Sequence, residues 1–299
     1  MPSPPTASII IPCYNQGQYL GAALLSARAQ TFEDIEIIVV DDGSDDPESQ
    51  EAMAALEDQI DILIRTDNYG VVNARNTAID AASGRYILPL DADDIIEPGY
   101  LEQAIDALEN DPNLGIVYCH ADYFGEKQGP WKLPPYRFPE ILVGNMIFNS
   151  SVFRRDDWAR VGGYNPNMQY GWEDYDFWIA IISLGREVLQ LPDTLFHYRI
   201  LPGSRNSALG DNMVQAHVQI FHNHRDLYEE HIDVLFNTLV RLWRHAARSQ
   251  QDSENTQQEL AALRQELADL QAHGAAAVDA STNTPAPGLL GKLVALFRA

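Results

Sequence analysis

Residues 86–94 read Tyr-Ile-Leu-Pro-Leu-Asp-Ala-Asp-Asp, a short apolar run that ends abruptly in carboxylates. Gly84 precedes the run, which is typical of a buried strand. The carboxyl end of this strand would bring Asp91, Asp93 and Asp94 to one place, where their charges repel unless a cation or bound protons neutralise them. Mg²⁺ and Mn²⁺ bind one or two carboxylates together with water and substrate phosphates. The stretch therefore predicts a divalent metal that holds a phosphorylated ligand.

The same acidic turn has a simpler interpretation. Asp93 or Asp94 in front of Pro98 is also typical of the N-cap of a following helix. An Asp-x-Asp pattern alone does not separate the two readings, so the rest of the chain has to decide between them.

Length and composition indicate a globular protein with an acidic surface. The chain has 299 residues, of which 45% are hydrophobic, and a formal net charge of −23. This is room for one large α/β domain plus an appendage. The negative charge opposes nucleic-acid phosphate and no Lys/Arg stripe offsets it, so neither DNA nor RNA is an expected partner.

Cellular location follows from the cysteines and the first residues. Cys13 and Cys119 have no motif spacing and are expected to be buried thiols in a reducing compartment. Residues 1–8 contain no basic residue and lead into only three isoleucines, which matches neither a signal peptide nor a membrane span. We therefore expect a cytoplasmic protein.

Apolar runs alternate with segments of helical periodicity in the first third of the chain. The expected strands are residues 8–11, 35–40, 60–65 and 86–90, and the helices between them are residues 19–29, 48–56 and 72–82. This alternation predicts an α/β fold with a mostly parallel central sheet flanked by helices. In such sheets ligands bind beyond the carboxyl ends of the strands, so the loops after Ile11, Val40, Arg65 and Leu90 should converge.

The middle of the chain predicts a helix at 101–108, a strand at 115–120, a strand at 151–155 and a helix at 156–161. Residues 124–138, rich in Gly, Pro and aromatics, predict a loop that is either a lid or, as we expect, a surface excursion. A further helix begins within the aromatic and acidic stretch 171–178 and continues to residue 184. Glu173 and Asp174 stand at its start, where the positive end of the helix dipole favours ionised carboxylates. Capping and catalysis are both compatible with that position. His197 is either a metal ligand or a core histidine.

From Asn212 the chain is expected to be helical, with His217, His222, His224 and His231 on helix surfaces. Leu260, Leu263, Leu267 and Leu270 are spaced three and four residues apart, the pattern of a short coiled coil that acts as a spacer or homodimer contact. The predicted division is a domain at 1–207, a helical extension at 208–273, a linker at 274–288 and an amphipathic helix at 289–299.

The last segment combines an apolar face with two cations. As a helix, residues 289–299 would place leucines and Phe297 on one side, with Lys292 and Arg298 positioned for anionic headgroups. This predicts a peripheral membrane contact. Packing of the segment against the domain or a partner is equally compatible with the pattern.

Three sequence blocks together resemble the family 2 glycosyltransferases. They are residues 8–15 with 37–44, residues 73–76 with 82–94, and residues 162–164 with 171–176. Their order and spacing over about two-thirds of the chain are more specific than any block alone, and the tail after residue 207 lies outside the resemblance. The resemblance implies the A-type glycosyltransferase fold and a nucleotide-diphosphate sugar as donor.

The resemblance also implies roles for individual residues. Those implied to line the nucleotide pocket are Pro12, Tyr14, Asn15, Asp41, Asp42, Arg75, Asp91 and Ala92. A carboxylate there is able to accept the imide N–H of uracil. The implied metal ligands for Mn²⁺ or Mg²⁺ are Asp93, Asp91 and His197. The implied general base is Asp174 in the Glu173-Asp174 pair, and Arg199, Arg205 and Trp172 would contact the diphosphate or the acceptor.

The function implied is transfer of a sugar, with a UDP-sugar as the expected donor, to a glycan or lipid-linked acceptor in cell-envelope or polysaccharide biosynthesis. The resemblance implies an inverting, metal-dependent reaction, which needs one base and a stabilised leaving group rather than the flanking carboxylate pair of a hydrolase. A sugar nucleotidyltransferase would need a Gly-rich phosphate loop followed by Lys or Arg, which the first strand lacks. A non-catalytic sugar- or nucleotide-binding scaffold would lose the base or the metal site, whereas Asp93 and Asp174 are both present.

Overall fold

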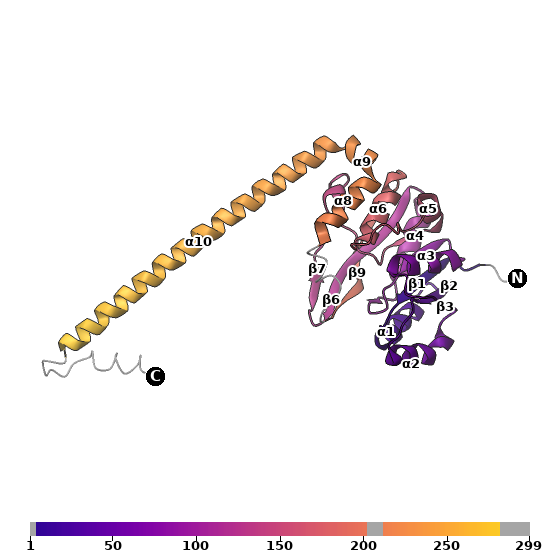
Figure 1. Ribbon diagram of the computed structural model, residues 1–299, viewed down its shortest axis with the longest axis horizontal. Helices are drawn as coiled ribbons and strands as arrows, with labels where there is room; N and C mark the ends of the chain where they lie inside the picture. The colour runs from indigo at the N-terminus through magenta and orange to yellow at the C-terminus, as the bar shows by residue number, and fades with distance from the viewer. Residues whose placement is uncertain (1–3, 202–211, 282–299) are drawn as a thin grey trace. The chain divides into compact units, whose positions relative to one another are not determined.

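The computed structural model describes residues 4–201 and 212–281, with side chains through residue 265. The chain divides into two compact units, Met1–Phe236 and Asn237–Ala299. The first unit is an α/β domain, and the described part of the second is the continuation of one long helix, α10 (Ile232–Ser281). Figure 1 shows both units, with most of their helices and strands labelled.

One mixed sheet organises the first unit. Its strands are β1 (Ala7–Cys13), β2 (Ile35–Asp41), β3 (Ile62–Arg65), β4 (Tyr86–Pro89), β5 (Ile95–Ile96), β6 (Leu114–Gly125), β7 (Gly129–Trp131), β8 (Val152–Arg154) and β9 (Glu187–Ile200). The strand order is β3-β2-β1-β4-β8-β6-β9-β5, with β7 paired to β6. Strands β1 to β4 are parallel, as expected, whereas β8 runs antiparallel to both β4 and β6. The α/β fold flanked by helices is confirmed.

Helices cover the sheet and follow the predicted periodicity to within a few residues. They are α1 (Gly17–Arg28), α2 (Pro47–Ala55), α3 (Val71–Ala81), α4 (Tyr100–Asn110), α5 (Arg155–Val161), α6 (Glu173–Ser183), α8 (Met213–Asn223) and α9 (Arg225–Glu230), with short 3₁₀ turns η1 (Glu57–Gln59) and η2 (Glu140–Val143). Helix α3 packs on β1 and β2, and α4 packs on β6 (Figure 1).

Hydrophobic burial explains the central strands. Every residue of β1 is buried, and so is every residue of β2 except Ile35 at its start. Strands buried on both faces read as continuous apolar runs. Glu36 is a charged residue within the apolar run of β2. Its carboxylate accepts hydrogen bonds from the Ser8 hydroxyl at 2.6 Å and the Ser83 N–H at 2.6 Å. This buried acid thereby joins β1 and β2 to the turn before β4.

Three segments have a secondary structure that differs from the sequence expectations. Residues 124–138, expected to be a surface loop, contain the end of β6 and its partner β7. The acidic turn at 91–94 leads into β5, so it caps no helix, and Gly99 is the N-cap of α4. Helix α10 runs through residues 274–281, where a linker was expected to begin, because this segment is rich in alanine.

The predicted coiled-coil leucines lie on α10, and the amphipathic segment 289–299 lies outside the described residues. Along the described helices, none is long and apolar enough to cross a membrane.

We predict that Gly84→Ala lowers the free energy of unfolding by about 1–3 kcal/mol, the range for overpacking. A Cβ at Gly84 would lie 2.6 Å from the backbone nitrogen of Ser8, and neither backbone can move without disturbing β1. Chemical denaturation measures the effect. Gly99→Ala is the matched control, since its nearest neighbour is the flexible Gln103 side chain at 3.6 Å, and equal effects of the two changes would contradict the prediction.

Candidate active site

The loops after β1 and β2 are held together by Asn15. Its side-chain oxygen accepts the backbone N–H groups of Asp45 and Asp46, each at 3.0 Å, and its amide nitrogen donates to Asp45 at 2.7 Å. Asn15 adopts φ 52°, a left-handed conformation that asparagine tolerates. The neighbouring Tyr14 ring is 41% exposed at this edge of the sheet. Two of the four loops that were predicted to converge, those after β1 and β2, therefore lie together.

The acids at the end of β2 shape the neighbouring loops. Asp41 accepts the N–H of Ser44 at 2.9 Å. Asp42 accepts the N–H groups of Tyr69 at 3.0 Å and Gly70 at 2.8 Å, which ties the loop after β3 to β2. Both carboxylates are buried, so they form part of the floor at this edge.

Arg75 is the central cation of the site. Its side chain is 3% exposed, and it donates to Glu173 and Asp91, each at 2.8 Å. Burial favours the neutral guanidine, but the two carboxylates raise the pKa of Arg75 above its usual value, so it keeps its charge. The arginine on α3 thereby links the acid after β4 to the first residue of α6.

The acidic turn contains three different carboxylates. Asp91 also accepts from the Asn149 amide at 3.3 Å. Asp94 is 1% exposed and accepts the backbone N–H of Arg199 at 2.8 Å. Burial and, after it, the charge of Asp91 raise the pKa of Asp93 to about 6. Asp94 is therefore bonded to β9, and Asp91 and Asp93 are the two acids of this turn that remain to bind a ligand.

This pair of acids fits a hard divalent cation. No group of three or more His, Cys, Asp or Glu side chains is arranged to hold a metal among the residues that the structure describes. The Nε2 atom of His197 lies 2.8 Å from a carboxylate oxygen of Glu97, because β9 pairs with β5. Two carboxylates are nevertheless sufficient, since Mg²⁺ and Mn²⁺ usually take their other ligands from water and substrate phosphates.

Asp174 follows Glu173, the second carboxylate partner of Arg75, in the first turn of α6. Burial and, after it, the charge of Glu173 raise the pKa of Asp174 to about 7. Its carboxylate accepts a hydrogen bond from the Asn145 amide at 3.3 Å. A carboxylate that titrates near neutral pH is suited to general base catalysis. The N-cap of α6 is Trp172, which makes no side-chain capping bond.

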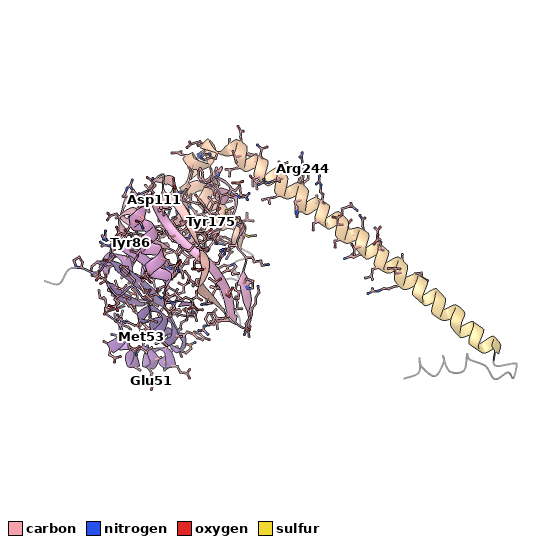
Figure 2. The ribbon with its side chains drawn as sticks, turned by 180° about the vertical axis from the view of Figure 1, so that it is seen from behind. Glu51, Met53, Tyr86, Asp111, Tyr175 and Arg244 are labelled. Carbon is pink, nitrogen blue, oxygen red and sulfur yellow. The ribbon has the colours of Figure 1, made fainter. Side chains whose placement is uncertain are left out.

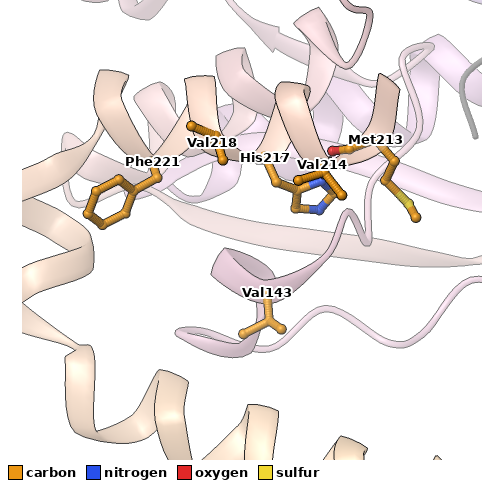
Figure 3. Close-up of a pocket in the computed structure, with 6 residues that line it drawn as sticks. All are labelled: Val143, Met213, Val214, His217, Val218 and Phe221. Atoms are coloured by element: carbon orange, nitrogen blue, oxygen red, sulfur yellow. Dashed lines mark hydrogen bonds between the residues drawn. The ribbon is translucent and has the colours of Figure 1, made fainter. Parts of the chain in front are cut away.

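Aromatic residues near Asp174 divide between the core and a pocket. Tyr175 and Trp178 are fully buried, so neither ring is available to stack on an acceptor sugar. The Trp172 ring lies 5.3 Å from the ring of His217. His217 in turn lines an apolar pocket of about 490 Å³ between Val143 and the α8 residues Met213, Val214, Val218 and Phe221 (Figure 3).

Several contacts had no sequence signal. Asn145 and Asn149 lie outside every motif, and only the fold brings them to Asp174 and Asp91. His224 was expected on a helix surface, but it is part-buried, with Nε2 3.0 Å from Asp176. Arg199 places its guanidinium over the rings of Tyr19 and Phe124 and donates to the backbone of Asp93 at 2.7 Å. Arg205 lies outside the described residues.

Comparison with known proteins decides the family. The sequence profile described as "Glycosyl transferase family 2" matches residues 8–170, more than half of the chain. The chain belongs to this family of enzymes. An uncharacterized glycosyltransferase of Haemophilus influenzae is 30% identical over 222 residues, covering 69% of this chain and 68% of that protein. Chondroitin synthase of Escherichia coli is 28% identical over 60% of this chain, which spans only 27% of that enzyme.

Solved structures share the fold. S. aureus TarS in complex with UDP-GlcNAc superposes with a TM-score of 0.58 at 19% identity, covering 68% of this chain and 61% of that one. The mannosyltransferase PcManGT from Pyrobaculum calidifontis, in complex with GDP-Man and Mn²⁺, gives 0.57 at 22% identity, covering 75% and 65%. At this identity the likeness establishes the fold alone.

We predict that Arg75→Met lowers the free energy of unfolding by about 3–5 kcal/mol at neutral pH, because Asp91 and Glu173 lose their buried counter-charge. Denaturant titration measures this. Arg85→Met is the matched control, since the Arg85–Glu109 pair is 65% and 45% exposed and is expected to contribute little. A small effect at Arg75, comparable with that at Arg85, would contradict the central position of this ion pair.

Proposed function

We propose that the chain transfers a sugar from a nucleotide-diphosphate donor, with a UDP-sugar as first candidate, to a hydroxyl of a glycan or lipid-linked acceptor. The observation that carries this proposal is the link Asp174-Glu173-Arg75-Asp91. It joins Asp174, a carboxyl group with a pKa near neutral, to Asp91, one of the two acids that we assign to the metal. Family membership and the nucleotide-sugar complexes of TarS and PcManGT support it.

The donor would occupy the edge formed by the loops after β1, β2 and β4. Pro12, Tyr14 and Asn15 lie at the end of β1, Asp41 and Asp42 lie at the end of β2, and Asp91 and Ala92 follow β4. The exposed Tyr14 ring offers a stacking face for a base. Arg75 is expected to act mainly by orienting Asp91, because its two terminal nitrogens already bind carboxylates.

Asp93 and Asp91 would hold Mn²⁺ or Mg²⁺, which would neutralise the charge that develops on the departing diphosphate. Arg199, whose guanidinium is fixed beside Asp93, adds positive charge on the same side, and we assign Arg205 to the diphosphate as well. His197 would have to leave Glu97 to join the metal. These assignments make the acidic turn the leaving-group side of the site.

Asp174 would act on the acceptor. Its carboxylate takes the proton of the acceptor hydroxyl while the hydroxyl oxygen attacks the anomeric carbon, and the bond from that carbon to the diphosphate oxygen breaks. The nucleoside diphosphate leaves with the bonding electrons. One displacement assisted by one base inverts the anomeric configuration. Glu173 is held by Arg75 and thereby fixes the start of α6, while Asn145 orients Asp174.

The acceptor would approach past Trp172 and the apolar pocket of Val143 and α8. Val143 lines the pocket, and Asn145, only two residues further along the chain, contacts Asp174. Asn145 therefore connects the pocket to the proposed base. Its lining is suited to a sugar face or to the apolar part of a lipid-linked acceptor. Trp172 connects the two features, because it precedes Glu173 and its ring contacts His217.

We predict that Asp174→Asn lowers the transfer rate about 10²-fold or more while nucleotide-sugar binding stays nearly unchanged. In the parent the rate should rise with pH up to about 7 and then level, since only the ionised base accepts a proton. Steady-state kinetics and donor titration check both points. Asp156→Asn, an exposed acid in the first turn of α5, is the matched control, and parental transfer by Asp174→Asn would refute the assignment.

The same substitution separates catalysis from folding. The raised pKa of Asp174 means that the folded state binds its proton more tightly than the unfolded state. The contribution of Asp174 to the free energy of unfolding is therefore fully present below about pH 4 and is lost as the pH rises through about 7. Asp174→Asn should unfold no more readily than the parent above pH 7. A strongly destabilised variant would instead indicate a structural acid.

We predict that UDP binds more tightly in the presence of Mn²⁺ or Mg²⁺, and that Asp93→Asn removes this dependence because one carboxylate ligand is lost. Calorimetry with and without chelator measures it, and a screen of nucleotide sugars scored by release of nucleoside diphosphate identifies the donor. Asp156→Asn, an exposed acid away from the turn, is again the control. Binding and turnover that are indifferent to chelator would exclude the metal.

A further inference from the structure

The described part of the second unit is a single helix with an exposed apolar stripe. Helix α10 runs without interruption from Ile232 to Ser281. The side chains of Leu239, Leu242, Leu260 and Leu263 are between 47% and 62% exposed. Figure 2 shows this helix beyond Arg244. Isolated helices obtain most of their stability from packing an apolar face, so a helix of this length with exposed leucines indicates an absent partner.

The stripe follows one heptad register over the whole unit. Starting at Leu239, residues spaced alternately three and four apart occupy the a and d positions of a coiled coil. They are Leu239, Leu242, Ala246, Ser249, Ser253, Thr256, Leu260, Leu263, Leu267, Leu270, Gly274 and Ala277. The leucines at the beginning and those near the end are thus in phase, although four small residues separate them.

The charged residues respect the same register. Those of residues 239–277 are Arg241, Arg244, Arg248, Asp252, Glu254, Glu259, Arg264, Glu266 and Asp269. None of them falls on an a or d position. Because a buried unpaired charge is strongly unfavourable, this exclusion keeps a continuous seam free for another helix.

We propose that α10 pairs with α10 of a second copy of this chain in a parallel, in-register, two-stranded coiled coil over residues 239–277. In this arrangement each leucine layer faces the same leucine layer of the partner. Glu259 at a g position lies opposite Arg264 at the e position of the other helix, so the flanking charges are complementary.

An antiparallel pair of the same overlap is less favourable. It would place Leu239 opposite Ala277, Leu242 opposite Gly274 and Leu263 opposite Ser253, so that no leucine meets a leucine. Every layer would pair one leucine with one small residue, so the leucine-leucine contacts of the parallel pair would be lost. The parallel pair instead forms two leucine sections joined by the small layers Ala246 to Thr256. It attaches both catalytic units at the same end of the coil.

Sedimentation equilibrium of the full chain tests the association. The expected result is a particle of twice the 33.4 kDa mass of one chain. The double change Leu260→Asp and Leu263→Asp should give the monomer, because it buries charges in the seam. Gln258→Asp with Ala262→Asp adds the same charge at outward positions and should stay dimeric. A parent chain that remains monomeric, including one that binds anionic vesicles as a monomer, would overturn the proposal.

Disulfide crosslinking tests the orientation. Ala246→Cys lies in the seam and Ala247→Cys lies outside it, and both positions are exposed in the single helix. The native Cys13 and Cys119 are buried and should not interfere. A parallel pair brings the two copies of residue 246 within reach of a disulfide, so Ala246→Cys should crosslink under mild oxidation and Ala247→Cys should not. Equal crosslinking of both, or of neither, would overturn the parallel register.

Discussion

The buried guanidinium of Arg75 is the constraint on which the site depends. It lies between Asp91, which follows β4, and Glu173, which begins α6, and almost no water reaches it. A charge in such surroundings is tolerated only when it is paired. Here the two partners of Arg75 come from different parts of the fold. The three residues therefore hold α3, the acidic turn and α6 in one arrangement. Asp91, proposed for the donor side, and the Glu173-Asp174 pair, proposed for the acceptor side, are thereby positioned together.

Burial then separates the roles of the remaining carboxylates. Asp93 and Asp174 both have raised pKa values, about 6 and about 7, because each is partly removed from water beside another acid. Asp93 lies beside Asp91, where a divalent cation would relieve the repulsion. Asp174 lies beside Glu173, whose charge is shared with Arg75. This difference in surroundings is the reason that we propose Asp93 as a metal ligand and Asp174 as the proton acceptor.

The sequence predicted the features that depend on local patterns. The strands and helices up to residue 90 follow from periodicity, and the acids at the ends of β2 and β4 follow from where those runs stop. Features that depend on long-range pairing were not accessible. The bond between His197 and Glu97 arises from the antiparallel register of β5 and β9, and Asn145 reaches Asp174 only through the folded chain. Similarly, nothing in the periodicity of α3 showed that Arg75 would be buried between two acids.

The central claim is that the acidic turn and Asp174 serve one site that Arg75 holds together. A crystal structure of the chain with UDP and Mn²⁺ tests it most directly. The account predicts an anomalous manganese signal between the diphosphate and Asp93, with Arg75 still bonded to both Asp91 and Glu173. A nucleotide bound away from Asp93, or an Arg75 that leaves Glu173 to contact the base, would contradict it.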